Sequence, residues 1–347
     1  MGRTLVVIEG LAGLALVATL AGALGCGSSD PASSQTPGAD ADAGDGPPSS
    51  GDAGAGPGAS DAAVGAPGTL CIGGEVYDLA SHDEFDQDTS LSVSDTWPTP
   101  PGTKWTNRFQ YGRTNNPGTD DAYYPSKETV AAWGAPPVAE LAPGVGVKLT
   151  SYLVPQAHAN DPILCEGGAC RKHLAGLLSS SEAHATGFWV YSVQTPGGPG
   201  WWPAAWLLNQ TTMGEYNEID NLEQWGPATF GPNVVVQTRQ LPMNSPNVKL
   251  TIASASSAQH TYAAIVTDSF TGFYIDGVPS SKRLARGPTT PMSPIMNLQS
   301  CIAGWCAPGP DPSGTGTMIV RYYRYYAPTS TAKTCAPPFD LPALAAN

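Results

Sequence analysis

Short strand-like runs separated by turn residues recur from residue 146 onward, and they constrain the fold more than any other feature. The clearest are 146–150, 187–193, 233–238, 248–252 and 318–323, with clusters of Gly, Pro, Asn and Ser between them. Short runs of this kind, without a long stretch of helical period, are typical of a β-sandwich or barrel. We therefore predict one large all-β domain.

The run 217–225, with the sequence NEIDNLEQW, holds three carboxylates within six residues. Side chains alternate between the faces of a strand, so Glu218 and Asp220 share one face and Glu223 falls out of phase. A one-residue β-bulge near Asn221 would return Glu223 to the first face, and bulges are frequent beside active sites. The three acids would then form one wall.

Such a wall suits glycoside hydrolysis. Carboxylates held close together repel, which pushes at least one toward its protonated form. Retaining glycosidases use one carboxylate as nucleophile and one carboxylic acid as proton donor, about 5–5.5 Å apart. The alternative is a solvated acidic face on an edge strand.

Residues 1–26 have the pattern of an export signal, which is removed from the mature chain. Arg3 lies near the start, an apolar run covers 11–24, and small residues precede Cys26. The end of this segment resembles a bacterial lipobox, whose cysteine is lipid-modified. We expect export to the bacterial cell envelope and a lipid anchor in a membrane, the outer membrane in the simplest case, with release outside the cell as the alternative.

Residues 27–68 consist largely of Ala, Gly, Ser, Pro and Asp, without one aromatic residue, Lys or Arg. This composition cannot bury enough apolar surface to fold, so we expect a disordered tether. Residues 69–347 would form the single domain.

Six cysteines remain when the lipobox cysteine is set aside. An even number in an exported chain favours disulfides. Zinc is the competing interpretation, but the short Cys-x-x-Cys spacing of zinc sites is missing. The predicted pairs are Cys165–Cys170, Cys301–Cys306 and Cys71–Cys335.

The net charge of −13 disfavours nucleic acid as a partner, because phosphates require a basic patch. No nucleotide fingerprint, phosphate loop or Gly-x-Ser-x-Gly elbow is present. The five histidines lack ligand spacing. We expect a monomer that requires no cofactor or metal.

The run GWWPAAWLL at 200–208, followed by EIDNLE at 218–223, resembles glycoside hydrolase family 16, in particular its laminarinase- and agarase-like members. Segments 259–262, 273–277 and 294–298 are similar to further strands of that family. The resemblance implies a jelly-roll β-sandwich of the concanavalin A type. Two curved antiparallel sheets would form it, with a concave cleft for a polysaccharide.

The resemblance also implies roles for individual residues. Glu218 would be the nucleophile, Glu223 the general acid and then base, and Asp220 would hold the geometry of the nucleophile. Aromatic rings stack on sugar rings while polar side chains bind hydroxyl groups. The candidates for substrate binding are Trp206, Trp225, Trp202, Asn107 and Gln237.

Several positions depart from the family pattern. Val190 and Ser192 stand where the family usually has Glu and Arg, and Gln237 stands near the position of an absent histidine. Arg321 replaces an Asp near which many members bind structural calcium. The resemblance therefore does not transfer a particular glycan or a calcium ion.

These observations predict an exported or lipid-anchored endo-β-glycanase that hydrolyses a polysaccharide, of the β-glucan or galactan class, with retention of configuration. The same scaffold also suits a transglycosylase. An alternative from another class is a non-catalytic glycan-binding jelly-roll lipoprotein.

The lipid anchor is testable by itself. A clickable fatty acid fed to a bacterial host that expresses the full chain should label Cys26, and Cys26→Ala should abolish the label. Mass spectrometry of the N-terminal peptide locates the modification. An unlabelled wild-type chain would exclude the anchor.

Overall fold

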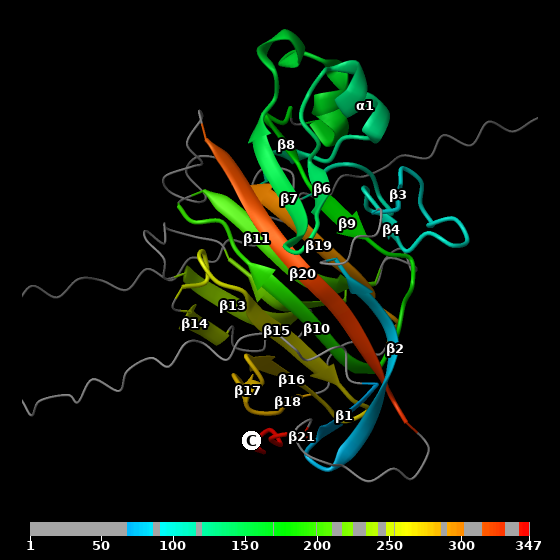
Figure 1. Ribbon diagram of the computed structural model, residues 1–347, viewed down its shortest axis with the longest axis vertical. Helices are drawn as coiled ribbons and strands as arrows, with labels where there is room; N and C mark the ends of the chain where they lie inside the picture. Colours follow the sequence, from blue (N-terminus) through cyan, green and yellow to red (C-terminus); the bar gives the residue numbers. More distant parts are fainter. Residues whose placement is uncertain are drawn as a thin grey trace, which may run out of the picture. The chain divides into compact units, whose positions relative to one another are not determined.

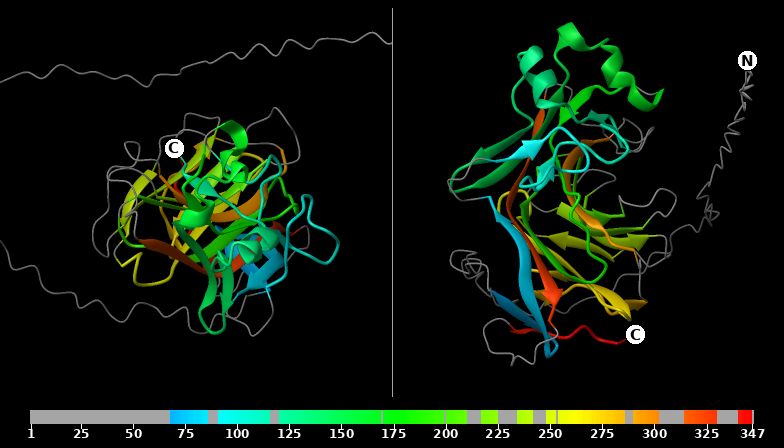
Figure 2. Two further views of the ribbon diagram at one scale, coloured as in Figure 1. Left: turned by 90° about the horizontal axis from the view of Figure 1, so that it is seen from above. Right: turned by 90° about the vertical axis from the view of Figure 1, so that its right-hand side faces the viewer.

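The computed structural model describes residues 68–85, 91–115, 120–168, 170–198, 200–209, 217–224, 234–241, 248–252, 254–285, 290–301, 314–329 and 340–346. Two β-sheets dominate these residues (Figures 1 and 2). The described helices are short: α1 (Lys127–Ala132), η1 (Gln156–His158) and η2 (Pro162–Gly168). The predicted all-β class is confirmed.

The first sheet is built around the long strand β20, which lies between β10 and β2 (Figure 1). Its main path runs β17 (Val278–Pro279), β16 (Phe270–Ile275), β15 (His260–Val266), β10 (Gly187–Gln194), β20 (Thr315–Pro328), β2 (Glu75–Glu84), β1 (Thr69–Ile72) and β21 (Asp340–Leu341). Beside this path lie β18 (Leu284–Ala285), β7 (Gly146–Leu153), β6 (Ala139–Ala142), β8 (His173–Ala175) and β5 (Ala122–Tyr123).

The second sheet carries the acidic run. Its order is β14 (Val248–Ile252), β13 (Val234–Leu241), β12 (Glu218–Glu223), β11 (Trp201–Leu208), β19 (Ser293–Ser300), β9 (Leu177–Ser179), β4 (Trp105–Thr106) and β3 (Val93–Ser94). Described strand pairs are antiparallel except for three short ones, β1 with β21, β3 with β4 and β5 with β8. Each of the five runs predicted as strands overlaps a strand of these sheets, and residue 233 of the third run lies outside the described residues.

Side chains from both sheets build the main core. Trp189 and Tyr191 of β10 share one buried cluster with Ile219 and Leu222 of β12. Trp189 and Tyr191 are two positions apart, as expected for residues that one strand turns toward a core between two sheets. The opposite face of the second sheet is therefore available for polar side chains.

The chain crosses from the first sheet to the second at Gly176, between β8 and β9. Its N–H donates to the carbonyl of Thr150 at 2.9 Å, and its own carbonyl accepts from the N–H of Leu298 at 3.1 Å. A Cβ atom at this position would lie 2.2 Å from the carbonyl oxygen of Val138. Glycine is therefore needed for this close approach of backbones.

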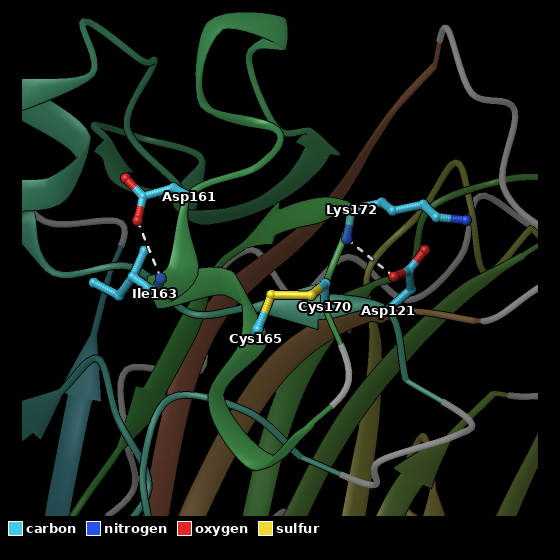
Figure 3. The surroundings of a disulfide bond; sticks show 6 residues. All are labelled: Asp121, Asp161, Ile163, Cys165, Cys170 and Lys172. Atoms are coloured by element: carbon cyan, nitrogen blue, oxygen red, sulfur yellow. Dashed lines mark hydrogen bonds between the residues drawn. A yellow bond between two sulfur atoms is a disulfide. The ribbon is translucent and has the colours of Figure 1, made fainter.

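The Cys165–Cys170 disulfide confirms one of the predicted pairs, and it joins η2 to the segment that leads into β8 (Figure 3). Cys71 and Cys301 are also disulfide-bonded. Their predicted partners lie outside the described residues, so those two pairings stay predictions.

The predicted export signal, Cys26 and the tether up to residue 67 lie outside the described residues. Among the helices that are described, none has the length and apolar character needed to cross a membrane. The first described strand begins at Thr69.

Candidate active site

Strand β12 holds the three acids between β11 and β13. Their side chains are almost buried, with exposed fractions of 3% for Glu218, 2% for Asp220 and 3% for Glu223. Ile219 and Leu222 belong to the core cluster between the sheets. The three carboxylates therefore share the face of β12 that is turned away from the core.

A one-residue bulge in β12 produces this arrangement. In the pairing with β11, Asp220 lies opposite Trp206, but Leu222 lies opposite Ala205. Asn221 is thus the extra residue, and the same shift appears in the pairing with β13. The bulge that the sequence predicted near Asn221 is confirmed.

The side chain of Asn221 faces the core and is fully buried. Its Nδ2 donates to the carbonyl oxygen of Trp189, on the opposite sheet, at 3.2 Å. If Asn221 paired regularly and formed no bulge, strict alternation would turn Glu223 toward the core, where a carboxylate without a polar partner is strongly unfavourable. With the bulge, the core contains the neutral amide of Asn221 and not the charged carboxylate of Glu223.

Glu223 receives a hydrogen bond from Trp202, whose Nε1 donates to Oε1 at 3.1 Å. In the sheet, Ala204 pairs with Glu223 on one side and with Asn297 on the other. Trp202 is two residues from Ala204, so it shares its face of β11. The indole orients the carboxyl group of Glu223.

A buried hydrogen-bond network lies next to the acids. The Nε1 of Trp206 donates to Oδ1 of Asn297 at 2.7 Å, and Nδ2 of Asn297 donates to the hydroxyl of Tyr124 at 3.1 Å. That hydroxyl donates to Oδ2 of Asp120 at 3.4 Å. Each hydrogen bond of this network has one defined donor and one defined acceptor, so the network fixes the orientation of Trp206.

Burial raises the pKa of Asp120 well above its usual range, and the pKa of Tyr124 is raised by burial and by the neighbouring Asp120. The sequence analysis missed both residues. Neither belongs to a run with a clear period, and the bond of Tyr124 to Asn297 joins segments more than 170 residues apart. Of the residues in this network besides Trp206, only Asn297 was indicated by the sequence, because it lies in the segment 294–298 that is similar to a strand of family 16.

A loop after β4 stands beside the acids and contributes two aromatic rings. Phe109 contacts Trp206, with ring centroids 6.1 Å apart, and Tyr111 stacks on Phe109 at 5.0 Å with an interplanar angle of 4°. Burial of the Tyr111 hydroxyl raises its pKa, and the negative charge of Glu218 adds to this effect. The sequence analysis did not select either loop residue.

Two of the three tryptophans predicted to stack on sugar are largely enclosed. Trp202 and Trp206 are 4% and 5% exposed, and the indole N–H of each is bonded within the protein. Gln237 pairs through its backbone with Glu223; its side chain and Trp225 lie outside the described residues. Sugar contact by all four stays a prediction.

Asn107 lies in a separate polar cluster. Its Nδ2 donates to Oδ1 of Asp95 at 2.6 Å and to the carbonyl of Pro125 at 3.0 Å, and its Oδ1 accepts from Arg113 at 3.2 Å. It also lines a pocket of about 440 Å³ beside α1 and β6. Its polar atoms are thus engaged within the protein, and its role in substrate binding stays a prediction.

Among the residues that the structure describes, no group of three or more His, Cys, Asp and Glu side chains is placed to hold a metal ion.

No protein-family model matches the chain, and no curated protein matches it. Among solved structures, similarity extends to SCLam, a non-specific endo-β-1,3(4)-glucanase from family 16, with 17% identity over 76% of this chain and 98% of that one, at a TM-score of 0.54. The laminarinase from Rhodothermus marinus has 20% identity, coverage of 73% and 98%, and a TM-score of 0.52.

A third similar structure is the catalytic domain of the endo-1,3-β-glucanase from Thermotoga petrophila RKU-1. It has 15% identity, coverage of 74% and 100%, and a TM-score of 0.53. These similarities show that the chain has the jelly-roll β-sandwich fold of family 16 glucanases. The predicted fold is thereby confirmed.

The role of Asn221 in holding the bulge can be measured. Asn221→Ala should lower the free energy of unfolding by about 1–3 kcal/mol, because it removes a buried hydrogen bond between the sheets. Urea denaturation of the isolated protein measures the change. Asn160→Ala, at an exposed position, is the control. An equal effect of the two substitutions would contradict this role.

Proposed function

We propose that this protein is an endo-acting β-glucanase that hydrolyses internal bonds of a β-glucan with retention of configuration. The observation that carries the proposal is the bulge at Asn221, which puts Glu218, Asp220 and Glu223 on one face of a β-strand. The fold shared with family 16 glucanases supports it.

The proposed chemistry has two steps. First, a carboxylate oxygen of Glu218 attacks the anomeric carbon, the bond from that carbon to the leaving sugar's oxygen breaks, and Glu223 gives its proton to that oxygen. Then Glu223 takes a proton from water, whose oxygen attacks the same carbon and releases Glu218. Two inversions at one carbon amount to net retention.

Asp220 lies between these two residues on the same face of β12. We assign to it the positioning of Glu218, since a third carboxylate so close also influences how protons are shared in the cluster. Burial of all three groups strengthens their mutual interaction, because the surroundings screen charge less than water does.

Trp202 has a defined part in this scheme. An indole N–H only donates, so its bond is made to a lone pair of Oε1 of Glu223 and it orients the carboxyl group. The acid is thus held in one orientation relative to the substrate. This arrangement lowers the cost of reaching the transition state because the donor is held in place beforehand.

The substrate class follows from the similar structures. A mutant of SCLam, at 17% identity and a TM-score of 0.53, was crystallised with 1,3-β-D-cellotriosyl-glucose. We therefore propose a mixed-linkage or β-1,3-linked glucan for this chain, with galactan as the other class to be tested. A neutral glycan also suits a site whose wall carries carboxylates.

The proposed location rests on the sequence alone. A lipid on Cys26 and a tether to residue 68 would hold the enzyme at the bacterial cell envelope, where extracellular polysaccharide reaches it.

Glu218→Gln should lower kcat on the best β-glucan by on the order of 10³-fold or more, because an amide cannot act as the nucleophile. Reducing-sugar release from a panel of β-glucans and galactans measures the rate, and proton NMR of the first products reports retention. Glu128→Gln, an exposed position on α1, should leave the rate unchanged.

An unchanged rate in Glu218→Gln would refute the nucleophile assignment. If the wild-type chain binds a glycan of the panel but releases no reducing sugar from any β-glucan or galactan, it is a glycan-binding protein and not a hydrolase.

Trp202→Phe should lower kcat by about tenfold to a hundredfold with a smaller change in KM, since it removes one hydrogen bond to the proton donor. Trp133→Phe, which alters the indole of the C-cap residue of α1, is the matched control. Circular dichroism checks that both variants fold. Equal kinetics in the two variants would show that the indole does not act through Glu223.

A further inference from the structure

We propose that Tyr111 is the aromatic platform on which a sugar ring of the bound polysaccharide stacks beside the three acids. This inference rests on the proposed function, and it assigns substrate recognition to a residue outside the strands that carry the acids.

Tyr111 is the most exposed aromatic side chain among the described residues, with an exposed fraction of 51%. Aromatic rings contribute large areas of apolar contact when they are covered, and Tyr is enriched at binding interfaces because its ring is apolar and its hydroxyl is polar. The position of this ring beside the acids, described below, makes it a candidate surface for the ligand.

The ring is held in one orientation. Phe109 covers one face of it in a nearly parallel stack, with centroids 5.0 Å apart and an angle of 4° between the planes. The hydroxyl of Tyr111 donates to Oδ1 of Asn115 at 3.0 Å. Nδ2 of Asn115 in turn donates to Oε1 of Gln299 on β19 at 3.4 Å. The ring is thus fixed by Phe109 and by its hydroxyl, and among the described residues no second aromatic ring stacks on its other face.

A fixed ring is an efficient binding surface, because it loses little conformational entropy when the ligand arrives. The faces of a β-linked glucose ring carry C–H groups, while its hydroxyl groups point outward around the edge. Such a face matches a flat aromatic ring. The ligand class is therefore a neutral hexopyranose within a β-linked chain.

The platform lies next to the acids. Phe109, beneath Tyr111, contacts Trp206, and Trp206 pairs in the sheet with Asp220. The charge of Glu218 acts on the hydroxyl of Tyr111 strongly enough to contribute to its raised pKa. A sugar stacked on Tyr111 would thus be adjacent to the bond that Glu218 and Glu223 act on.

Trp202 and Trp206 are poorly placed to stack on a sugar ring. Trp202 and Trp206 are almost buried, and their N–H groups bond to Glu223 and Asn297. They orient parts of the site from beneath. Tyr111 offers the open ring face that these two lack.

The test uses the full chain in the Glu218→Gln background, so that oligosaccharides bind without being cleaved. Isothermal titration calorimetry with a β-glucan tetrasaccharide or hexasaccharide measures Kd. Tyr111→Ala should weaken binding about tenfold or more, because the stacking surface is lost. Tyr111→Phe keeps the ring and should change Kd by less than about threefold. Tyr152→Ala, on β7, is the matched control.

Equal binding by the parent and Tyr111→Ala would overturn the platform. Equal loss in the Ala and Phe variants would also overturn it, because the hydroxyl and not the ring would then be responsible. If the chain binds glycan in a Tyr111-dependent manner but wild type never cleaves it, the platform stands and the hydrolase assignment fails. If wild type cleaves β-glucan and Tyr111→Ala leaves KM unchanged, the hydrolase assignment stands and the platform fails. Failure to bind and to cleave any glycan of the panel would overturn both.

Discussion

The alternation of side chains along a β-strand governs the chemistry of the second sheet. Every residue of β12 must face either the core between the sheets or the outer face, and two core residues, Ile219 and Leu222, are three positions apart. A spacing of three is incompatible with a strict period of two. The extra residue Asn221 resolves the conflict, and the same residue brings Glu223 into line with Glu218. The packing of Ile219 and Leu222 in the core and the shared face of the three acids thus depend on the same bulge.

The aromatic residues around the acids divide into two groups with different tasks. Trp202 and Trp206 lie beneath the surface and act through their N–H groups, which orient Glu223 and Asn297. Phe109 and Tyr111 approach from a loop and form a stack that ends in an open ring. Tryptophan serves the first task because it combines a large apolar body with one donor, and tyrosine serves the second because its hydroxyl can be anchored while its ring stays free.

Much of this structure could be predicted because it is local. The strand runs, the shared face of Glu218 and Asp220, and the need for a bulge all follow from a period of two, and the structure confirms them. The Cys165–Cys170 disulfide spans five residues and was predictable for the same reason.

The rest depends on contacts between distant segments. The bonds of Trp206 and Tyr124 to Asn297 span 91 and 173 residues, and no periodic pattern reports such contacts. The stack of Tyr111 on Phe109 lies in a loop, where side-chain direction is set by the surroundings and not by a repeat. Sequence reasoning selected tryptophans for sugar stacking by residue type, and it had no information on how far the neighbouring loop would cover them.

Gly176 links the two sheets more closely than side-chain packing alone. Its amide belongs to the hydrogen bonding of one sheet and its carbonyl to that of the other, so a single peptide segment is shared by both layers. Sliding of one layer over the other would break backbone hydrogen bonds and not only apolar contacts. The two layers should consequently unfold in one cooperative transition.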